Sequence, residues 1–326
     1  MEKIRIVFDS FHLYHLPQFE PVIEKLQSNP RFTVRLSYSS LIPPAEKAIL
    51  NQILPRFSLP VITAETEIDR GKQIRSWKPQ VFICGWSRYD LPDFVTEKTL
   101  VGMIYHGIGV KPSYWRDHHP RLDVRFVEGP LRIRQLTQNG IKSKLTLTGF
   151  AKLDPLFIPN EHHGQDIAEE LKLDPDKPTL LYAPTFYPSS LERFGLRLGP
   201  LTEGYNVILK LHMWTYFRNQ WAGVSLKSQL KLAQKLETRF AHIHLLGPEA
   251  YNIVPYYQIA DLLLTEASST IYEMMALDKP VVLADFYKLR LSHQIFRQRL
   301  YKKRLNAEMS QSMTEFCLHL DKPRQL

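Results

Sequence analysis

Polar residues suited to chemistry follow apolar segments at several points, and the clearest case lies in residues 260–284, ADLLLTEASSTIYEMMALDKPVVLA. Here an apolar run leads into Ser268 and Ser269, after which a helical pattern begins. A helix that starts at this turn leaves backbone N–H groups unpaired, and such groups bind the phosphates of a nucleotide. The same serines could equally be ordinary N-caps that serve the helix alone. The candidate donor-binding residues of this turn are Glu266, Ser268, Ser269 and Thr270.

Two histidines also follow apolar segments. His106 precedes Gly107, and a glycine lets a ligand approach the backbone closely. A histidine at this position could take a proton from an attacking hydroxyl, or could merely bond a neighbouring backbone carbonyl. His212 could donate to a phosphoryl oxygen, or could be an interior histidine whose ring is already satisfied. His106 and His212 are therefore the two candidate catalytic residues.

Other polar residues stand just after predicted strands, where parallel sheets bind their ligands. Lysines there could balance phosphate charge, although a solvated lysine is the commoner case. Glu273, one helical turn beyond the serine pair, could reach a ribose or could remain a helix-face residue. The further candidates for donor binding are Gly107, Lys111, Thr185 and Lys210, and the candidates for ribose or acceptor contacts are Lys152, Asp154 and Glu273.

The elements that would hold these residues alternate between short apolar strands and helices. In the first half, strands are expected at 4–8, 32–38, 79–84, 100–105, 124–127 and 145–148, with helices at 18–27, 45–54, 67–77 and 130–139. In the second half, strands are expected at 179–183, 207–211, 242–246, 261–264 and 280–284, with helices at 225–240 and 269–277. Nearly continuous apolar strands separated by helices predict parallel sheets covered on both faces.

Two such series of elements predict an α/β protein with two doubly wound, Rossmann-like domains facing a central cleft. A polar, proline-containing stretch between the two series is the predicted linker. The expected parts are a first domain at 1–155, the linker at 156–178, a second domain at 179–286 and a basic, helical C-terminal segment at 287–326. Neither a Gly-x-Gly-x-x-Gly fingerprint nor a P-loop occurs, which disfavours dinucleotide and ATP-type sites.

The composition of the 326 residues, with 44% hydrophobic and 23% charged, is typical of a globular protein, and the formal net charge is +9. This charge is uneven along the chain. Residues 1–150 carry 21 basic and 14 acidic side chains, residues 151–286 carry 12 and 16, and residues 287–326 carry 9 and 3. Basic regions favour anionic partners, and phosphorylated substrates or anionic lipids fit better than nucleic acid, because no nucleic-acid-binding motif occurs.

No apolar run of 18 residues predicts a membrane span, and the N-terminal sequence predicts a first strand rather than a signal peptide. The two cysteines, Cys84 and Cys317, indicate neither a disulfide framework nor a zinc site. We therefore expect a cytoplasmic protein with no metal centre and no cofactor. Dependence on a divalent cation stays open, because no carboxylate cluster stands out.

Together these motifs resemble those of the CDP-glycerol glycerophosphotransferase family, the teichoic-acid primases and polymerases with a GT-B-like fold. The motifs that carry the resemblance are His106-Gly107-x-x-x-Lys111, Gly149-x-x-Lys152-x-Asp154, Tyr182-Ala183-Pro184-Thr185, Lys210-x-His212 and Thr265-Glu266-x-Ser268-Ser269. Their order and spacing cover about half of the chain. The positions that depart from the family pattern are Ile108, Phe186-Tyr187, Met213 and Glu266-Ala267.

The resemblance implies transfer of a polyol-phosphate, glycerol-phosphate above all, from a CDP-linked donor to an acceptor hydroxyl, with release of CMP. By resemblance, His106 is the base, His212 contacts the donor phosphates, and Ser268 and Ser269 hold the pyrophosphate. The second domain would then bind the donor, and the first would face a glycan or lipid-linked acceptor in cell-surface polymer synthesis. Two alternatives stay open: a GT-B glycosyltransferase or sugar-nucleotide 2-epimerase that uses a UDP- or CMP-sugar, and a catalytically silent relative.

The segment 287–305 holds seven basic residues and no acidic residue. Its apolar residues recur at helical spacing, which predicts a basic amphipathic helix. Such a helix could lie on an anionic membrane, here the inner face of the plasma membrane, or could instead pack back across the domains.

Overall fold

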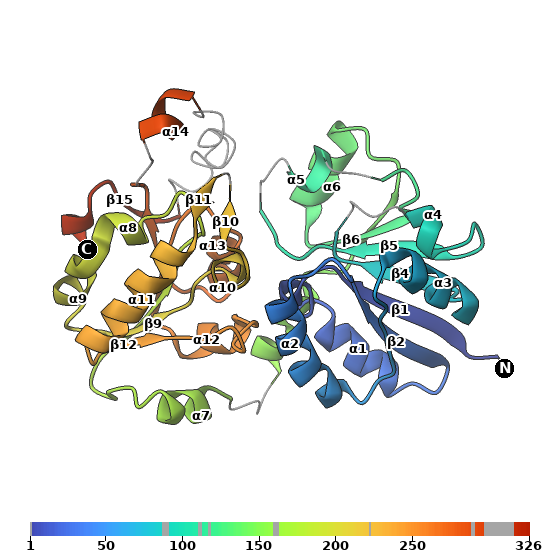
Figure 1. The fold of residues 1–326 in the computed structure, drawn as a ribbon, viewed down its shortest axis with the longest axis horizontal. Coiled ribbons are helices and arrows are strands. Elements are labelled where there is room, and N and C mark those ends of the chain that lie inside the picture. The colour runs from blue at the N-terminus through green and yellow to red at the C-terminus, as the bar shows by residue number, and fades with distance from the viewer. Residues whose placement is uncertain are drawn as a thin grey trace. The chain divides into compact units, whose positions relative to one another are not determined.

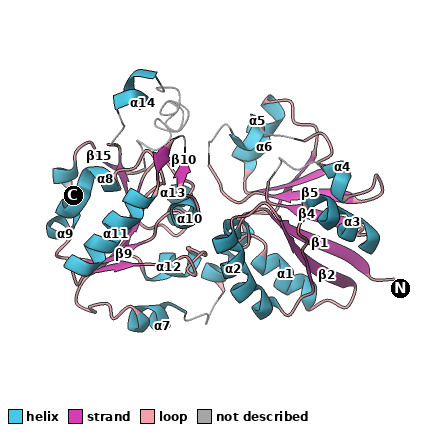
Figure 2. Cartoon of the chain, viewed as in Figure 1, coloured by secondary structure: helices cyan, strands magenta, loops and turns pink. Residues whose placement is uncertain are grey.

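The computed structural model describes residues 2–86, 91–109, 113–116, 119–158, 163–221, 223–287, 291–296 and 316–326. The chain divides into two compact units, Met1–Pro159 and Asn160–Leu326. Each unit has its own parallel sheet and its own flanking helices, as Figures 1 and 2 show. Each also has its own hydrophobic core. The two units are therefore described one after the other.

The first unit is built on a seven-stranded parallel sheet in the order β3-β2-β1-β4-β5-β6-β7. Its strands are β1 (Ile4–Ser10), β2 (Phe32–Tyr38), β3 (Val61–Ile62), β4 (Val81–Cys84), β5 (Leu100–Ile104), β6 (Val124–Val127) and β7 (Lys144–Leu147). Its helices are α1 (Glu20–Gln27), α2 (Pro44–Ile53), α3 (Glu67–Trp77), α4 (Leu91–Phe94), α5 (Ser113–Arg116) and α6 (Pro130–Gln138). Short 3-10 turns are η1 (Leu13–His15), η2 (Leu54–Phe57) and η3 (Ala151–Phe157).

Burial and local capping explain why these residues form these elements. The central strand β1 buries Val7 on one face and Phe8 on the other, as expected for a strand covered on both sides. Helix α3 begins where the Thr66 hydroxyl accepts a hydrogen bond from the backbone N–H of Asp69 (3.1 Å). It ends at Lys78, which adopts the left-handed conformation that commonly terminates helices.

The second unit contains a six-stranded parallel sheet in the order β12-β9-β8-β13-β14-β15. Its strands are β8 (Thr179–Ala183), β9 (Asn206–Leu209), β12 (Ile243–Leu245), β13 (Leu262–Thr265), β14 (Val281–Ala284) and β15 (Leu318–Leu320), beside a small hairpin of β10 (Gln220–Trp221) and β11 (Val224–Ser225). Its helices are α7 (His163–Glu170), α8 (Leu191–Phe194), α9 (Leu198–Leu201), α10 (Met213–Phe217), α11 (Lys227–Arg239), α12 (Val254–Ile259), α13 (Thr270–Met275) and α14 (Leu291–Phe296). Two 3-10 turns are η4 (Gly195–Arg197) and η5 (Pro323–Gln325).

Both sheets run outwards from their first strand in the same way. In the first unit β1 lies between β2 and β4, and in the second β8 lies between β9 and β13. At these switch points successive connections leave in opposite directions, which opens a crevice beyond the carboxyl ends of the strands. The predicted α/β class with doubly wound sheets is confirmed.

The structure departs from the expected elements mainly at sheet edges. The edge strands β3 and β15 and the hairpin β10–β11 were not expected, because two or three residues give no detectable period. Segment 287–326 is not wholly helical, since Leu318–Leu320 pairs in parallel with β14. The expected basic helix at 287–305 lies largely outside the described residues, apart from Tyr287 and α14. None of the helices in the described part of the chain combines the length and apolarity of a bilayer crossing.

Candidate active site

The ring of His106 is fixed by a backbone carbonyl in the first unit. His106 lies just after β5, and its Nδ1 atom is 3.0 Å from the carbonyl oxygen of Gly85, which follows β4. A carbonyl oxygen can only accept a hydrogen bond, so Nδ1 carries the proton in this contact. In the neutral ring Nε2 is then the basic atom. The carbonyl-bonded alternative raised by the sequence is therefore confirmed, and it is compatible with a role of Nε2 as a base, which stays a prediction.

Aromatic rings surround His106. The rings of His15 and Trp86 stack on it with centroid distances of 4.9 and 5.7 Å and interplanar angles of 28° and 11°. Tyr14 approaches edge-on at 5.6 Å. These rings come from the segments that follow β1 and β4, the two strands at the switch point. The sequence did not predict any of the three as a site residue.

His15 and Gln18 lie fully buried beside Gly85. A Cβ atom placed on Gly85 would lie 2.8 Å from Nε2 of Gln18 and 3.2 Å from the ring of His15. Among the residues that the structure describes, neither the ring nitrogens of His15 nor the amide atoms of Gln18 have a hydrogen-bond partner. Burial, followed by the neighbouring His106 and His12, holds the pKa of His15 well below 6.5, so this ring is neutral.

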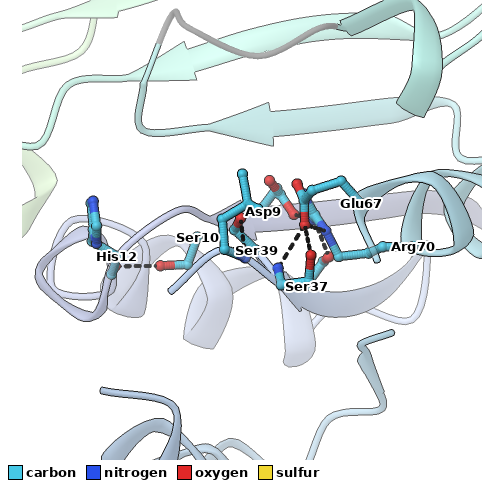
Figure 3. A network of polar contacts seen from close by, with 9 residues as sticks. Asp9, Ser10, His12, Ser37, Ser39, Glu67 and Arg70 are labelled. Atoms are coloured by element: carbon cyan, nitrogen blue, oxygen red, sulfur yellow. Dashed lines mark hydrogen bonds and ion pairs between the residues drawn. The ribbon is translucent and has the colours of Figure 1, made fainter. Parts of the chain in front are cut away.

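A buried ionic network holds the segment after β1 (Figure 3). The guanidinium of Arg70 donates to Asp9 at the end of β1, to Ser37 (2.8 Å) and to Glu67 (2.6 and 2.9 Å). One residue further on, the Ser10 hydroxyl donates to the carbonyl of His12 (2.6 Å). These bonds fix the path of the chain as it leaves the sheet towards His12 and His15.

A second anchor comes from α2. The buried carboxylate of Glu46 accepts from the backbone N–H of Leu13 (2.7 Å) and lies 3.3 Å from Nδ1 of His12. The chain is thus tied at the end of β1 and again at the start of η1, which positions the rings of Tyr14 and His15 beside His106.

His212 in the second unit has the opposite ring polarity. It stands just before α10, and its Nδ1 atom accepts a hydrogen bond from the backbone N–H of Trp214 (3.2 Å). Since Nδ1 is the acceptor, the neutral ring carries its proton on Nε2. His212 can therefore donate a hydrogen bond, as stabilisation of a phosphoryl oxygen requires. The ring of Phe186 packs against it at 4.7 Å.

Glu266 lies at the switch point of the second sheet, directly after β13, and it is fully buried. Its carboxylate accepts from the backbone N–H and hydroxyl of Thr185, from the hydroxyl of Ser189, and from the backbone N–H and hydroxyl of Ser190. Burial raises the pKa of Glu266, and these hydrogen bonds oppose that rise. The sequence predicts Glu266 as a donor ligand. In the structure its hydrogen bonds hold the loop after β8, and a contact between Glu266 and the nucleotide donor stays a prediction.

The serine pair lies half-buried at the start of α13. Ser269 is the residue before the helix, yet its side chain makes no capping hydrogen bond and its backbone is already helical. The Ser268 hydroxyl is 3.5 Å from the N–H of Thr270, at the limit of a hydrogen bond. The Thr270 hydroxyl pairs with that of Thr265 (3.1 Å). An ordinary N-cap therefore does not explain Ser269, whereas Thr270 has a structural partner.

The remaining predicted residues have mixed settings. Lys210 is buried after β9, with Nζ 3.8 Å from the sulfur of Met213. Glu273 is buried and accepts a hydrogen bond from the Tyr257 hydroxyl (2.9 Å), so a ribose contact by it stays a prediction. The other predicted residues are Gly107, buried beside His106; Lys152 and Asp154, both in η3 of the first unit; and Lys111, outside the described residues.

Partial burial raises the pKa of Asp154, and the charge of Lys25 opposes this. Within the described ranges, no group of three or more His, Cys, Asp or Glu side chains is arranged to hold a metal ion.

A family described as CDP-glycerol:poly(glycerophosphate) glycerophosphotransferase matches residues 132–291, nearly half of the chain. The match includes His212 and the 265–270 turn, and it confirms the family resemblance and the glycerophosphotransferase-like enzyme class that the motifs predict. No curated protein matches the sequence.

Solved structures share the fold across nearly the whole chain. The wall teichoic acid polymerase TagF superposes with a TM-score of 0.64 at 16% identity, covering 98% of this chain and 77% of that chain. A putative UDP-N-acetylglucosamine 2-epimerase from Listeria monocytogenes gives 0.61 at 14% identity, covering 97% and 92%. The UDP-GlcNAc 2-epimerase from Neisseria meningitidis bound to UDP-GlcNAc gives 0.57 at 16% identity, covering 93% and 94%. The fold is GT-B-like, as predicted.

Proposed function

From the premise that this chain resembles the CDP-glycerol glycerophosphotransferase family and is an enzyme of that kind, we propose that it transfers a polyol-phosphate, glycerol-phosphate first of all, from a CDP-linked donor to an acceptor hydroxyl and releases CMP. The family match over residues 132–291 supports the donor class. The acceptor in this proposal is a glycan or lipid-linked chain, and the product belongs to a cell-surface polymer.

In the proposed reaction, Nε2 of His106 takes the proton of the acceptor hydroxyl. The acceptor oxygen then forms a bond to the phosphorus that carries the glycerol. The bond from this phosphorus to the oxygen bridging the two phosphates breaks, and CMP leaves with that electron pair. Phosphoryl transfer of this kind depends on positioning and charge stabilisation rather than on covalent help from the protein.

Stabilisation of the leaving phosphate is assigned to the second unit. Nε2–H of His212 would donate to a phosphoryl oxygen, and the hydroxyl of Ser269, which does not cap its own helix, would donate alongside it. Glu266 contributes indirectly, because it holds the loop of Thr185 beside this turn.

The observation that carries the proposal is the opposite ring polarity of the two histidines. His106 presents an acceptor nitrogen and His212 presents a donor N–H, and each polarity is set by a backbone group. A transfer reaction needs both. A base takes the proton of the incoming hydroxyl, and a hydrogen-bond donor stabilises the negative charge that develops on the leaving phosphate.

Calorimetric titration of the full chain with CDP-glycerol, CDP, CMP, UDP-GlcNAc and UDP tests the donor class. We expect cytidine ligands to bind selectively, and CMP to appear when CDP-glycerol and an acceptor are both present. Preference for the uridine ligands would instead favour the glycosyltransferase or epimerase alternative. Binding of CDP-glycerol without any CMP release across an acceptor panel would point to the silent relative.

We further propose that the protein works on the cytoplasmic face of a membrane and contacts anionic lipid through segment 287–305. Within α14, Leu291 and Ile295 are 76% and 66% exposed, whereas His293 is buried and bonds the Tyr187 hydroxyl (3.0 Å). Exposed apolar side chains in a segment whose sequence is rich in basic residues suit an anionic bilayer surface. Binding to anionic vesicles should weaken with salt, and equal binding to neutral vesicles would refute this contact.

A further inference from the structure

Four half-buried rings form one surface at the carboxyl end of the first sheet: Phe11, Tyr14, Trp86 and His106, which we term the ring surface. Trp86 joins them, with its centroid 6.0 Å from Phe11 and 5.7 Å from His106, and Tyr14 lies 5.6 Å from His106. We propose that this ring surface is an acceptor subsite that binds a sugar ring next to the base. The inference rests on the proposed function and specifies its acceptor.

The chemistry of the ring surface favours a sugar over a phosphate chain. Aromatic faces left partly open in a ligand site contribute apolar contact area, and the C–H face of a sugar ring supplies a flat apolar partner for them. A phosphate group is recognised instead by cations or by clustered backbone N–H groups. Among the described residues, the rings of Tyr14, His15, Trp86 and Tyr114 lie against His106, and His15 is neutral.

The groups beneath the ring surface suit hydroxyls for a second reason. His15 and Gln18 are fully buried and uncharged, and their four polar side-chain atoms have no partner among the described residues. Each such buried group costs free energy when it is left unpaired. An imidazole and a carboxamide both donate and accept, and this matches a sugar hydroxyl, which does the same.

The ring surface is also built in advance of binding. Arg70 holds the end of β1 (Figure 3), and Glu46 holds His12 and Leu13. Phe11 therefore lies between two anchors, and Tyr14 follows directly after the second. A site that is already ordered loses little conformational entropy when a ligand binds. Weak contacts from ring faces can then produce measurable affinity.

Two probes of different chemistry test the inference on the full chain: the methyl glycoside of N-acetylglucosamine and glycerol 3-phosphate, both titrated by saturation-transfer NMR. We expect the glycoside to bind more tightly. Trp86→Ala should raise its Kd about tenfold, equivalent to about 1.4 kcal/mol, and Trp86→Phe should recover most of the affinity. Trp77→Phe is the matched control, since Trp77 is half-buried, packs against the core and lies beside Arg35. The glycoside Kd of this variant should equal that of the unmodified chain.

Tighter binding of glycerol 3-phosphate, or an unchanged glycoside Kd in both Trp86→Ala and Tyr14→Ala, would overturn the sugar subsite. A titration of the same samples with CDP-glycerol distinguishes failure of the sugar subsite from failure of the proposed function. Donor binding without glycoside binding would reject the subsite alone. Glycoside binding that depends on Trp86, without donor binding, would reject the proposed function and leave the subsite standing.

Gln18→Leu separates a ligand-binding role from a structural one. Leucine removes a buried, unpaired carboxamide at similar volume, so the melting temperature should stay equal or rise. If Gln18 serves the sugar, the glycoside Kd should nevertheless rise at least threefold. An unchanged Kd together with a higher melting temperature would remove Gln18 from the subsite.

Discussion

The Nδ1 atom of His106 and the carbonyl oxygen of Gly85 are 3.0 Å apart, and this contact joins the ends of β5 and β4. The carbonyl accepts the ring proton, so the basic nitrogen of His106 is Nε2. Asparagine can place an amide N–H where Nδ1–H lies but offers nothing in place of Nε2. The ring's structural role and its proposed chemical role can therefore be separated by substitution.

His106→Asn should keep the bond to Gly85 and lose the base. We expect turnover of CDP-glycerol to fall about 10²- to 10⁴-fold, the range for loss of a general base. The melting temperature and the Kd for CDP-glycerol should stay close to those of the unmodified chain. His106→Ala, which loses the bond as well, should also lower the melting temperature. Turnover at the original rate in His106→Asn would remove His106 as the base.

Gly85→Ala should misplace His106 without touching its ring. The added methyl group would lie 2.8 Å from Gln18 and 3.2 Å from His15, both fully buried, so the backbone of residue 85 must shift. We expect turnover to fall about tenfold or more, because small displacements of a catalytic group are costly. Gly129→Ala is the control, since its new Cβ would have nothing within 4 Å, and equal turnover in both variants would contradict the argument.

His212 can be divided in the same way. His212→Asn keeps an acceptor for the N–H of Trp214 but has no group in place of Nε2–H. His212→Gln has a longer side chain, which restores an N–H near the position of Nε2–H. We expect the Kd for CDP-glycerol to rise about tenfold or more in the asparagine variant, since hydrogen bonds to charged groups contribute about 1.5–3 kcal/mol. The glutamine variant should bind better than the asparagine variant. Equal affinities for CDP-glycerol in the unmodified chain and the two variants would show that Nε2–H of His212 does not contact CDP-glycerol.

Glu266→Ala tests positioning rather than ligand contact. Five donors from Thr185, Ser189 and Ser190 would lose their buried acceptor, and we expect the unfolding free energy to drop by about 2–4 kcal/mol. Ser269→Ala, at a residue that makes no capping bond, should change it by less than about 0.5 kcal/mol yet weaken CDP-glycerol binding. Denaturant unfolding measures the unfolding free energy of both variants. Similar unfolding free energies in Glu266→Ala and Ser269→Ala would contradict the positioning role of Glu266.

The buried ring of His15 gives a pH signature. Its pKa is depressed in the folded chain, so the unfolded chain takes up the proton first as the pH falls below about 6.5. The folded state therefore loses stability from His15 below that pH, by up to about 1.4 kcal/mol per pH unit. His15→Phe removes this loss, so its stability relative to the unmodified chain should improve from pH 7 to pH 5. A relative stability that is constant over this range, measured by urea unfolding, would show that the pKa of His15 is the same in the folded and the unfolded chain.

Sequence reasoning located what depends on short, local patterns. The long central strands are predicted because each is apolar over its length, and the structure confirms them and places His106 and His212 just after two of them. Helix α3 has the ends that the sequence predicts, Glu67 and Trp77. The edge strands β3 and β15 are too short to carry such a pattern.

The features that could not be predicted from the sequence depend on contacts between segments that are far apart along the chain. Tyr14, His15 and Trp86 reach His106 from two other strand ends, and no spacing along the chain reveals that meeting. Glu266 was assigned to the ligand because its residue type suits a polar site. Its burial, and the loop of Thr185 that surrounds it, could be known only once the two strands were side by side.

The hydrogen bonds of Glu266 have a further consequence for how the second unit folds. They join residues that are 76 to 81 positions apart in the sequence. The strands β8 and β13 are neighbours in the sheet, but β9 and β12 lie between them along the chain. Closing so long a loop is slow relative to forming a local helix. Ordering of the loop after β8 is therefore expected among the late steps of folding. During synthesis, the loop of Thr185 would therefore become ordered only after β13 and Glu266 have been made.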